Sequence, residues 1–323
     1  MNTAARILLT RLHRLVERAA FLGVLFTLAG LFGRHAWYLE LFTHFKLQLA
    51  GCFALYVLPE CTARHWHHAI TGVAFAAVNV LPVLMLCLPV APQQPPAIFA
   101  PAARIRVLQA NVLTGNRDAA ALLSLVAREA PDVIVLQETN QRWLNDLAGL
   151  TNAYPVFAAV PREDNFGAAI YGKTNAQTAE ILYLDSDDAV PSTRARLTVN
   201  GRPLTVIGAH PFAPYSRSRW QGRNRHLQRL AKHVRSVQGP CVVTGDFNNT
   251  PWSTYFQTFL ADSGLCDSAR GRCLQPTWPT FLPPFARIPL DHAAHSPDVR
   301  VTARRLGPPI GSDHLPVILD IAF

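Results

Sequence analysis

The chain has 323 residues, of which 50% are apolar and 16% are charged. Soluble domains usually carry about 25% charged residues, so this composition excludes a disordered or fibrous protein. Residues 1–100 hold seven Lys and Arg against three Asp and Glu, and residues 101–323 hold 23 against 18. That balance is too mild to diagnose a nucleic-acid-binding protein, although it favours anionic partners.

Three apolar runs in residues 1–90 predict a membrane anchor of three transmembrane helices. Residues 69–90 contain no charged side chain and would reach about 33 Å as a helix, enough to cross a hydrocarbon core. Residues 19–35 and 38–59 are weaker candidates. The charge-free part of the first reaches only about 22 Å, and the second contains three polar residues near its start, Glu40, His44 and Lys46.

The basic residues orient these helices in the membrane. With three spans, the Arg-rich start and residues 64–68 lie on one side, and the positive-inside bias places the C-terminal part outside the cytoplasm. With two spans the orientation reverses. A cleaved signal peptide is the alternative, but Leu31-Phe32-Gly33 is a poor cleavage site and further apolar segments follow. We therefore expect a bacterial inner-membrane protein whose C-terminal domain is periplasmic or extracellular.

A Pro-rich linker over residues 91–103 separates this anchor from a domain over residues 104–323. Cys266 and Cys273 lie seven residues apart within that domain. A disulfide between them would fit an oxidising exterior, and two unrelated thiols fit the sequence equally well.

The domain begins with a pattern that predicts a strand, a helix and a second strand. Residues 104–112 alternate and reach Asn111, Asp118 can cap a helix that ends before Pro131, and the apolar run 133–136 stops at Glu138.

The second half of the domain repeats this pattern of strands that end in polar groups. Asn200-Gly201 predicts a hairpin whose second arm ends at His210, and residues 216–237 have helical spacing. The strand at 241–244 runs into Gly245-Asp246-Phe247-Asn248. Polar groups at strand ends gather along one edge of a layered α/β protein, which predicts a catalytic face. Its candidate residues are Asn111, Glu138, His210, Asp246, Asn248, Asp291, Asp313 and His314.

In this set the sequence resembles the endonuclease/exonuclease/phosphatase superfamily. Six motifs occur in the order found in that family: Gln109-Ala-Asn111, Leu136-Gln-Glu138, Gly208-Ala-His210, Gly245-Asp-Phe-Asn248, Leu290-Asp-His292 and Ser312-Asp-His314. The resemblance covers residues 104–323 and none of the anchor. It implies a four-layered α/β sandwich, two mixed β-sheets flanked by helices, preceded here by transmembrane helices.

The resemblance also implies a metal-dependent phosphoesterase. Mg²⁺ takes oxygen ligands, and Asn111, Glu138 and Asp313 are the candidates to hold it, with Mn²⁺ as an alternative ion. It further implies that Asp291 holds His314 and that Asp246 orients or deprotonates a water. His210 and Asn248 would donate to the phosphoryl group. Whether Asp246 or His314 is the general base stays open.

One position departs from the family pattern. Several nucleases of the family carry Asp two residues after the motif Asn, where this chain has Leu113, which cannot bind a metal. A nuclease-like second metal is therefore in doubt, and a phosphodiesterase or phosphatase is favoured.

Outside the motifs, Trp278 is a candidate wall of the substrate pocket, with packing as the alternative role. The helix at 216–237 carries seven basic residues and no acid. Arg217 and Arg219 on it are candidate substrate-binding residues, and the alternative is a solvated face.

Three functions remain in view. The first is a membrane-anchored phosphodiesterase or phosphatase that acts on phospholipid headgroups or small phosphoesters. The second is a nuclease acting on DNA, and the third is a non-enzymatic membrane protein with a degenerate catalytic fold. The expected partners are accordingly a phosphoester substrate, such as a phospholipid headgroup or nucleic acid, and the bilayer.

Overall fold

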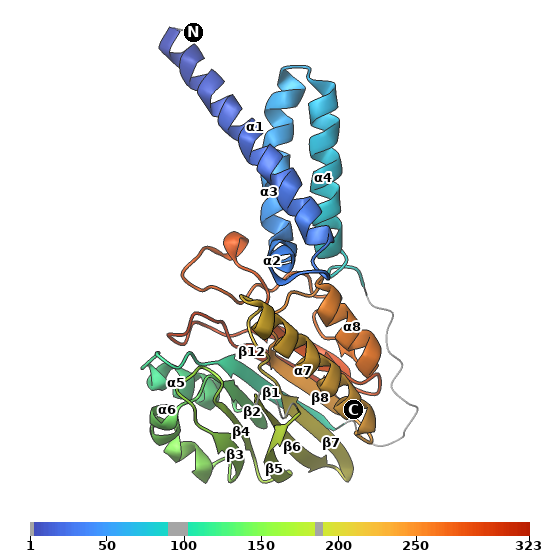
Figure 1. The fold of residues 1–323 in the computed structure, drawn as a ribbon. Helices are drawn as coiled ribbons and strands as arrows, with labels where there is room; N and C mark the ends of the chain where they lie inside the picture. The colour runs from blue at the N-terminus through green and yellow to red at the C-terminus, as the bar shows by residue number, and fades with distance from the viewer. Residues whose placement is uncertain (1–2, 90–102, 185–189) are drawn as a thin grey trace.

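A computed structural model describes residues 3–89, 103–184 and 190–323, and most of the predicted linker lies outside these ranges. In it a helical bundle stands on a layered α/β domain (Figure 1). Two sheets of six strands each form the middle of that domain. In spatial order the first sheet is β11 (Arg300–Leu306), β12 (Val317–Ala322), β1 (Arg104–Asn111), β2 (Val133–Gln137), β4 (Ala168–Gly172) and β3 (Val156–Val160).

The second sheet packs against the first. Its strands, in spatial order, are β5 (Ala176–Tyr183), β6 (Pro191–Val199), β7 (Arg202–Gly208), β8 (Cys241–Asp246), β10 (Asp291–His295) and β9 (Cys266–Asp267). Small and branched apolar side chains fill the space between the sheets, among them Val107, Val135, Val206 and Val242. Because strands β1 and β2, and likewise β7 and β8, are parallel within otherwise antiparallel sheets, both sheets are mixed.

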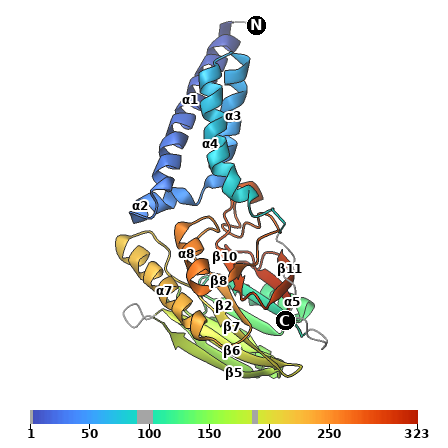
Figure 2. The same cartoon turned by 90° about the vertical axis from the view of Figure 1, so that its right-hand side faces the viewer.

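Helices cover the outer faces of both sheets, which gives the four layers expected from the sequence (Figures 1 and 2). The outer face of the first sheet packs against α5 (Ala119–Glu129) and α6 (Gln141–Asp146), and that of the second against α7 (Arg217–Ser236) and α8 (Thr254–Ser263). Each parallel strand pair is joined through one of these helices, α5 or α7. Such crossovers bring the carboxyl ends of the paired strands to the same edge.

Residues 3–89 contain α1 (Thr3–Leu31), α2 (Trp37–Glu40), α3 (Lys46–Thr62) and α4 (Trp66–Leu84). Three short 3₁₀ helices complete the part of the fold that the structure describes: η1 (Leu41–Thr43), η2 (Ala148–Asn152) and η3 (Pro284–Ala286). Helix α4 is long and apolar enough to cross a membrane, and the pair Trp37–Thr43 and Lys46–Thr62 would supply a second span if it counted as one broken span. By length and composition, the described residues thus hold one candidate span, or two.

The range 38–59, one of the two weaker candidate spans of the sequence, is broken into two helical parts in the structure. It bends by 61° between η1 and α3. The reason is Glu40, which is 2% exposed and faces the catalytic domain instead of a bilayer. Its carboxylate Oε2 lies 2.6 Å from Arg223 Nη2 and accepts a hydrogen bond of 2.6 Å from Trp220 Nε1, both on α7. The pair therefore lies at the interface between the helical bundle and the α/β domain.

Further contacts hold the foot of the bundle on the domain. Trp252 Nε1 donates to the carbonyl oxygen of Thr43 at 2.8 Å, and Gln48 Nε2 donates to the carbonyl oxygens of Phe285 and Arg287 at 3.1 and 3.2 Å.

A disulfide also joins the two parts. The sequence left a bond between Cys266 and Cys273 open, but the structure joins Cys273 to Cys87, just beyond α4. The backbone N–H groups of Gly271 and Cys273 donate to the carbonyl oxygen of Leu86, and these contacts bring the two cysteines together.

Candidate active site

The carboxyl ends of four strands meet at one edge of the sandwich and carry the predicted catalytic residues there. Asn111 ends β1, Glu138 follows β2, His210 follows β7 and Asp246 ends β8. Asp291 begins β10 and pairs with Asp246 across the antiparallel ladder. The loop before β12 brings Asp313 and His314 to the same edge, because β12 runs antiparallel to β1.

These residues surround a cavity of about 770 Å³. Its wall includes most of the residues predicted for the site: Glu138, His210, Arg219, Asp246, Asn248, Trp278, Asp313 and His314. Asn111 and Asp291 lie behind this wall and contact its members.

Arg217 does not line the cavity and is exposed. Two residues along a helix correspond to a rotation of about 200°, so Arg217 and Arg219 point to opposite sides of α7.

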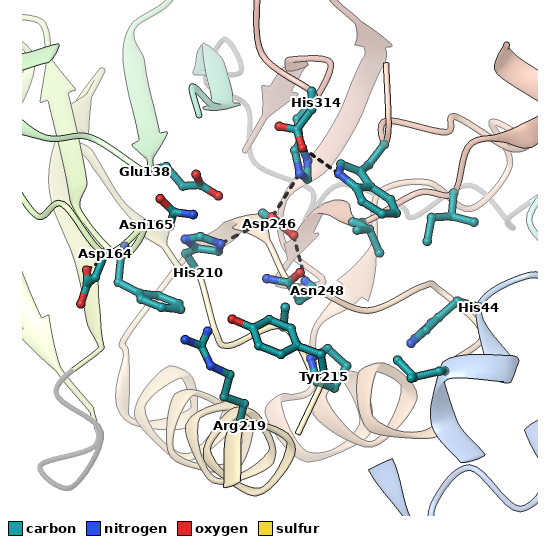
Figure 3. A pocket seen from close by; sticks show the side chains of 18 of the residues that line it. His44, Glu138, Asp164, Asn165, His210, Tyr215, Arg219, Asp246, Asn248 and His314 are labelled. Carbon is teal, nitrogen blue, oxygen red and sulfur yellow. Dashed lines mark hydrogen bonds and ion pairs between the residues drawn. The ribbon is translucent and has the colours of Figure 1, made fainter. Parts of the chain in front are cut away.

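Asp246 lies at the centre of the site, between the two histidines (Figure 3). Its Oδ2 is 3.5 Å from His210 Nε2 and 3.6 Å from His314 Nε2. Burial disfavours its charge, but the positive charges of His314 and His210 outweigh burial and lower the pKa of Asp246 below its usual range. Asp246 is therefore a carboxylate at neutral pH.

His314 is held by the buried carboxylate of Asp291, whose Oδ2 lies 2.8 Å from His314 Nδ1. Gln109 Nε2 donates to the other oxygen of Asp291 at 2.9 Å. Burial alone would lower the pKa of His314, but the charges of Asp291 and Asp246 raise it to about 10. At neutral pH the site thus contains an imidazolium beside the Asp246 carboxylate. The pKa of His210 is also raised, because Asp246 outweighs the effect of burial.

The charge of His314 predicts the alkaline limb of the pH profile. We expect kcat/KM for phosphoester cleavage to hold above pH 7 and to fall as the pH passes about 10, where His314 loses its proton. Initial rates across pH 6 to 11 measure this, and the residual rate of His314→Gln should lack the limb. A limb near the ordinary imidazole pKa of about 6.5 would contradict the assignment and make neutral His314 the base.

Asn111 positions carboxylates in this structure. Its Nδ2 donates to Glu138 Oε1 at 2.9 Å and to Asp246 Oδ2 at 3.1 Å. Its Oδ1 accepts from the backbone N–H of Leu113 at 3.0 Å, which fixes the orientation of the amide. The amide nitrogen of Asn111 therefore faces the carboxylates, and its oxygen faces the backbone.

The backbone around the candidate metal site is unusual. Leu113, Glu138 and Asn248 have positive φ angles of 59°, 62° and 49°. Residues other than glycine rarely adopt a positive φ angle, because the surrounding structure must enforce this strained conformation. Such residues are found most often at functional sites. Gly245 precedes Asp246, and a Cβ there would lie 1.9 Å from the carbonyl oxygen of Ala209. The Gly-Asp-Phe-Asn turn thus needs glycine to bring Asp246 this close to the strand that leads to His210.

Oxygen donors at this edge suit a hard divalent cation. Glu138 and Asp313 both line the cavity, and Trp278 Nε1 donates to Asp313 Oδ2 at 2.9 Å. Carboxylate oxygens supplemented by substrate oxygens and water are the ligands that Mg²⁺ prefers. The residues present therefore fit such an ion.

Several cavity residues were missing from the sequence prediction. The ring of Phe166 lies beside that of His210 in a tilted arrangement, with centroids 5.4 Å apart, and the guanidinium of Arg219 lies 4.5 Å from the ring centroid of Tyr215. Leu41, His44 and Phe45 come from the segment that was assigned to a membrane span. The sequence contained one sign of these residues, because Glu40, His44 and Lys46 interrupt the apolar run with polar side chains.

His292, next to Asp291, does not line the cavity. Its ring stacks on that of Phe256 in the core, with centroids 4.1 Å apart.

A sandwich of two mixed sheets with carboxylates and imidazoles at this edge defines a phosphoesterase fold. A model of the Endonuclease/Exonuclease/phosphatase family matches residues 108–314, and the chain belongs to this family. It is accordingly a hydrolase of phosphoester bonds. Enzymes of this family are generally divalent-metal dependent.

Solved structures share the fold. D. rerio TDP2 complexed with a single-strand DNA product is 19% identical, with a TM-score of 0.56 over 68% of this chain and 98% of its own. The human Nocturnin catalytic domain with bound sulfate is 21% identical, with a TM-score of 0.57 over 68% and 94%. A protein of this family from Bacteroides vulgatus is 17% identical, with a TM-score of 0.56 over 68% and 98%. No curated protein matches the sequence.

Proposed function

We propose that the chain is a membrane-anchored, Mg²⁺-dependent phosphodiesterase or phosphatase whose substrate is a phospholipid headgroup ester. The observation that carries this proposal is the composition of the cavity wall. Leu41, His44 and Phe45, at the foot of the helical bundle, share the wall with Asp246 and His314. Figure 3 shows His44 beside the same cavity, next to the pale blue ribbon of the N-terminal helices. A substrate in this cavity therefore lies beside the helices that we expect to enter the bilayer.

Exposed apolar side chains support the membrane assignment. Most large apolar residues that are exposed in the described chain lie on α1, α3, α4 and their connections, such as Phe21, Leu25, Leu55, Ile70 and Leu81. Soluble monomers rarely expose such extended apolar surfaces. The same exposure supports α1 as a third span beside α3 and α4, although its first half carries several charges. The bundle then orients the domain to the side opposite the Arg-rich N-terminus, outside the cytoplasm.

A second apolar element lies beside the bundle. The loop that contains η3 rises next to the foot of α3 (Figure 1), and Phe281 and Phe285 on it are 77% and 73% exposed. Exposed aromatic rings favour the interface between lipid and water. The disulfide between Cys87 and Cys273 supports an oxidising compartment such as the periplasm.

In the proposed mechanism Asp246 orients the attacking water and accepts its proton, since it is the ionised group at the centre of the site. His314, protonated and held by Asp291, stabilises negative charge that develops on the phosphoryl group. His210 and Asn248 donate hydrogen bonds to the same oxygens, and Asn111 positions Glu138. Glu138 and Asp313 would hold Mg²⁺, which neutralises phosphate charge when bound.

Hydrolysis by the full chain in detergent or nanodiscs tests this proposal. The substrates are phospholipids in mixed micelles, a soluble aryl phosphodiester and single-stranded DNA, each with Mg²⁺ or with chelator. We expect chelator-sensitive hydrolysis of the phospholipid. Replacing both Phe281 and Phe285 with Ser should lower this rate and leave that of the soluble diester unchanged. Tyr183→Ser is the matched control, because Tyr183 is 57% exposed on β5, far from the bundle.

Preferential cleavage of DNA would instead establish the nuclease. The fold shared with TDP2, whose structure contains a DNA product, is the observation that keeps this alternative in view. Absence of turnover on every substrate by a folded chain that does not bind metal would favour a degenerate fold.

A further inference from the structure

Five side chains converge at the end of the bundle farthest from the active site, and the proposed phosphoesterase chemistry uses none of them. His13 and Glu17 lie one turn apart on α1, Glu60 lies near the end of α3, and His65 and His68 lie at the start of α4. The turn between α3 and α4 is at the distal tip of the bundle in Figures 1 and 2. Three helices therefore contribute to one cluster of imidazoles and carboxylates.

The donor atoms in this cluster are spaced like the ligands of one ion. Glu60 Oε2 lies 3.1 Å from His65 Nδ1 and 3.2 Å from His68 Nδ1. His13 Nε2 lies 3.5 Å from Glu60 Oε1 and 3.4 Å from Glu17 Oε1. Ligands about 2.0 to 2.1 Å from a tetrahedral zinc ion are about 3.3 Å apart. Two groups of ligand atoms share Glu60, one with His13 and His65 and one with Glu17 and His68, and within each group the ligand atoms lie within 4.8 Å of one another. The contacts from Glu60 to His65 and His68 are hydrogen bonds as they stand, and their lengths fit the edges of such a coordination shell.

The burial of Glu60 is a second, independent observation that points to a cation site. Its side chain is 0% exposed, and its Oε1 is buried without a hydrogen-bond partner in the described structure. Burying a carboxylate whose oxygen is unsatisfied is costly. A metal ion in contact with that oxygen would remove the cost.

We propose that His13, Glu17, Glu60, His65 and His68 bind a divalent transition-metal ion, for which Zn²⁺ is the reference. Three imidazole nitrogens with one or two carboxylates suit zinc and neighbouring transition metals, whereas Mg²⁺ prefers oxygen ligands alone. The ion would connect α1 to the α3–α4 hairpin at its tip. This site is separate from the phosphoesterase site and does not depend on its assignment.

Zinc binding by the full chain in detergent, purified without a histidine tag, tests the proposal. The protein carries Glu138→Gln to weaken the catalytic metal site, and Zn²⁺ affinity is measured by competition with a chromophoric chelator. Total zinc per chain is measured by mass spectrometry. We expect one tightly bound Zn²⁺ per chain. Adding Glu60→Gln should weaken it by about 100-fold or more, since losing an outer-shell partner alone costs about 10- to 100-fold.

Because Glu60 is buried, Glu60→Gln could lose zinc simply by misfolding. A second variant separates loss of the metal site from loss of the fold. His65 and His68 have side chains 53% and 58% exposed, so replacing both with Ala should keep the helical circular dichroism and still remove the zinc. The matched control is His67→Ala, an exposed residue between them that is outside the cluster. It should bind zinc as tightly as the parent. Unchanged zinc affinity in the Glu60 and His65/His68 variants, or no zinc on the parent, would overturn the proposal.

Discussion

Replacing Asp246 with Asn or His314 with Ala is expected to lower the rate of phosphoester hydrolysis by about 10²- to 10⁴-fold. Asn keeps the shape of Asp246 but can neither accept the proton of the water nor hold the positive charges of His210 and His314. Ala at position 314 removes the imidazolium that Asp291 orients at 2.8 Å. Both losses act on charge that develops in the transition state, so they should appear mainly in kcat.

Steady-state kinetics on the full chain measure these effects, and circular dichroism shows whether the fold is kept. His233→Ala is the matched control, because His233 lies on α7 outside the cavity wall. Full activity in either catalytic variant would disprove the mechanism.

Replacing Glu40 with Gln is expected to lower the free energy of unfolding by about 3 to 5 kcal/mol. The change leaves the guanidinium of Arg223, whose side chain is 0% exposed, without its counter-charge. It also removes the charged acceptor of Trp220 Nε1 and Ser253 Oγ. The foot of the bundle, and with it Leu41 and His44 in the cavity wall, should then detach at lower denaturant concentration.

Denaturant unfolding of the full chain in detergent measures this loss. Asp146→Asn breaks the exposed pair between Arg142 and Asp146, and such pairs contribute only about 0 to 1 kcal/mol. Replacing Glu40 with Leu and Arg223 with Met together should restore most of the stability, because a buried ion pair can be exchanged for apolar packing. Equal effects of Glu40→Gln and Asp146→Asn would show that the pair does not hold the interface.

Local signals account for the parts of the fold that the sequence predicted. Apolar alternation and turn residues placed the strands, as in the hairpin at Asn200-Gly201 that joins β6 and β7. The cap at Asp118 accepts from the N–H of Ala121 as expected. The candidate catalytic residues were predictable for the same reason, since each lies at a strand end or in a loop beside one.

Interactions between distant segments could not be predicted. Glu40 and Arg223 are 183 positions apart, and nothing in either local pattern identifies the partner. The sequence showed only an acid in an apolar run and a basic helix without acids. The disulfide is similar, because the sequence offered a local pair of Cys266 and Cys273 or two unrelated thiols, whereas the fold brings Cys87 to Cys273.

That disulfide bridges the chain on either side of residues 90–102, since one cysteine precedes them and the other follows. A single backbone cut anywhere in residues 90–102 would leave both fragments in one covalent molecule. The catalytic half would stay on its helices after such a nick, with the cavity wall still composed of both fragments. Separating the catalytic domain from the helical bundle would therefore require reduction of the disulfide as well as a cut in the backbone.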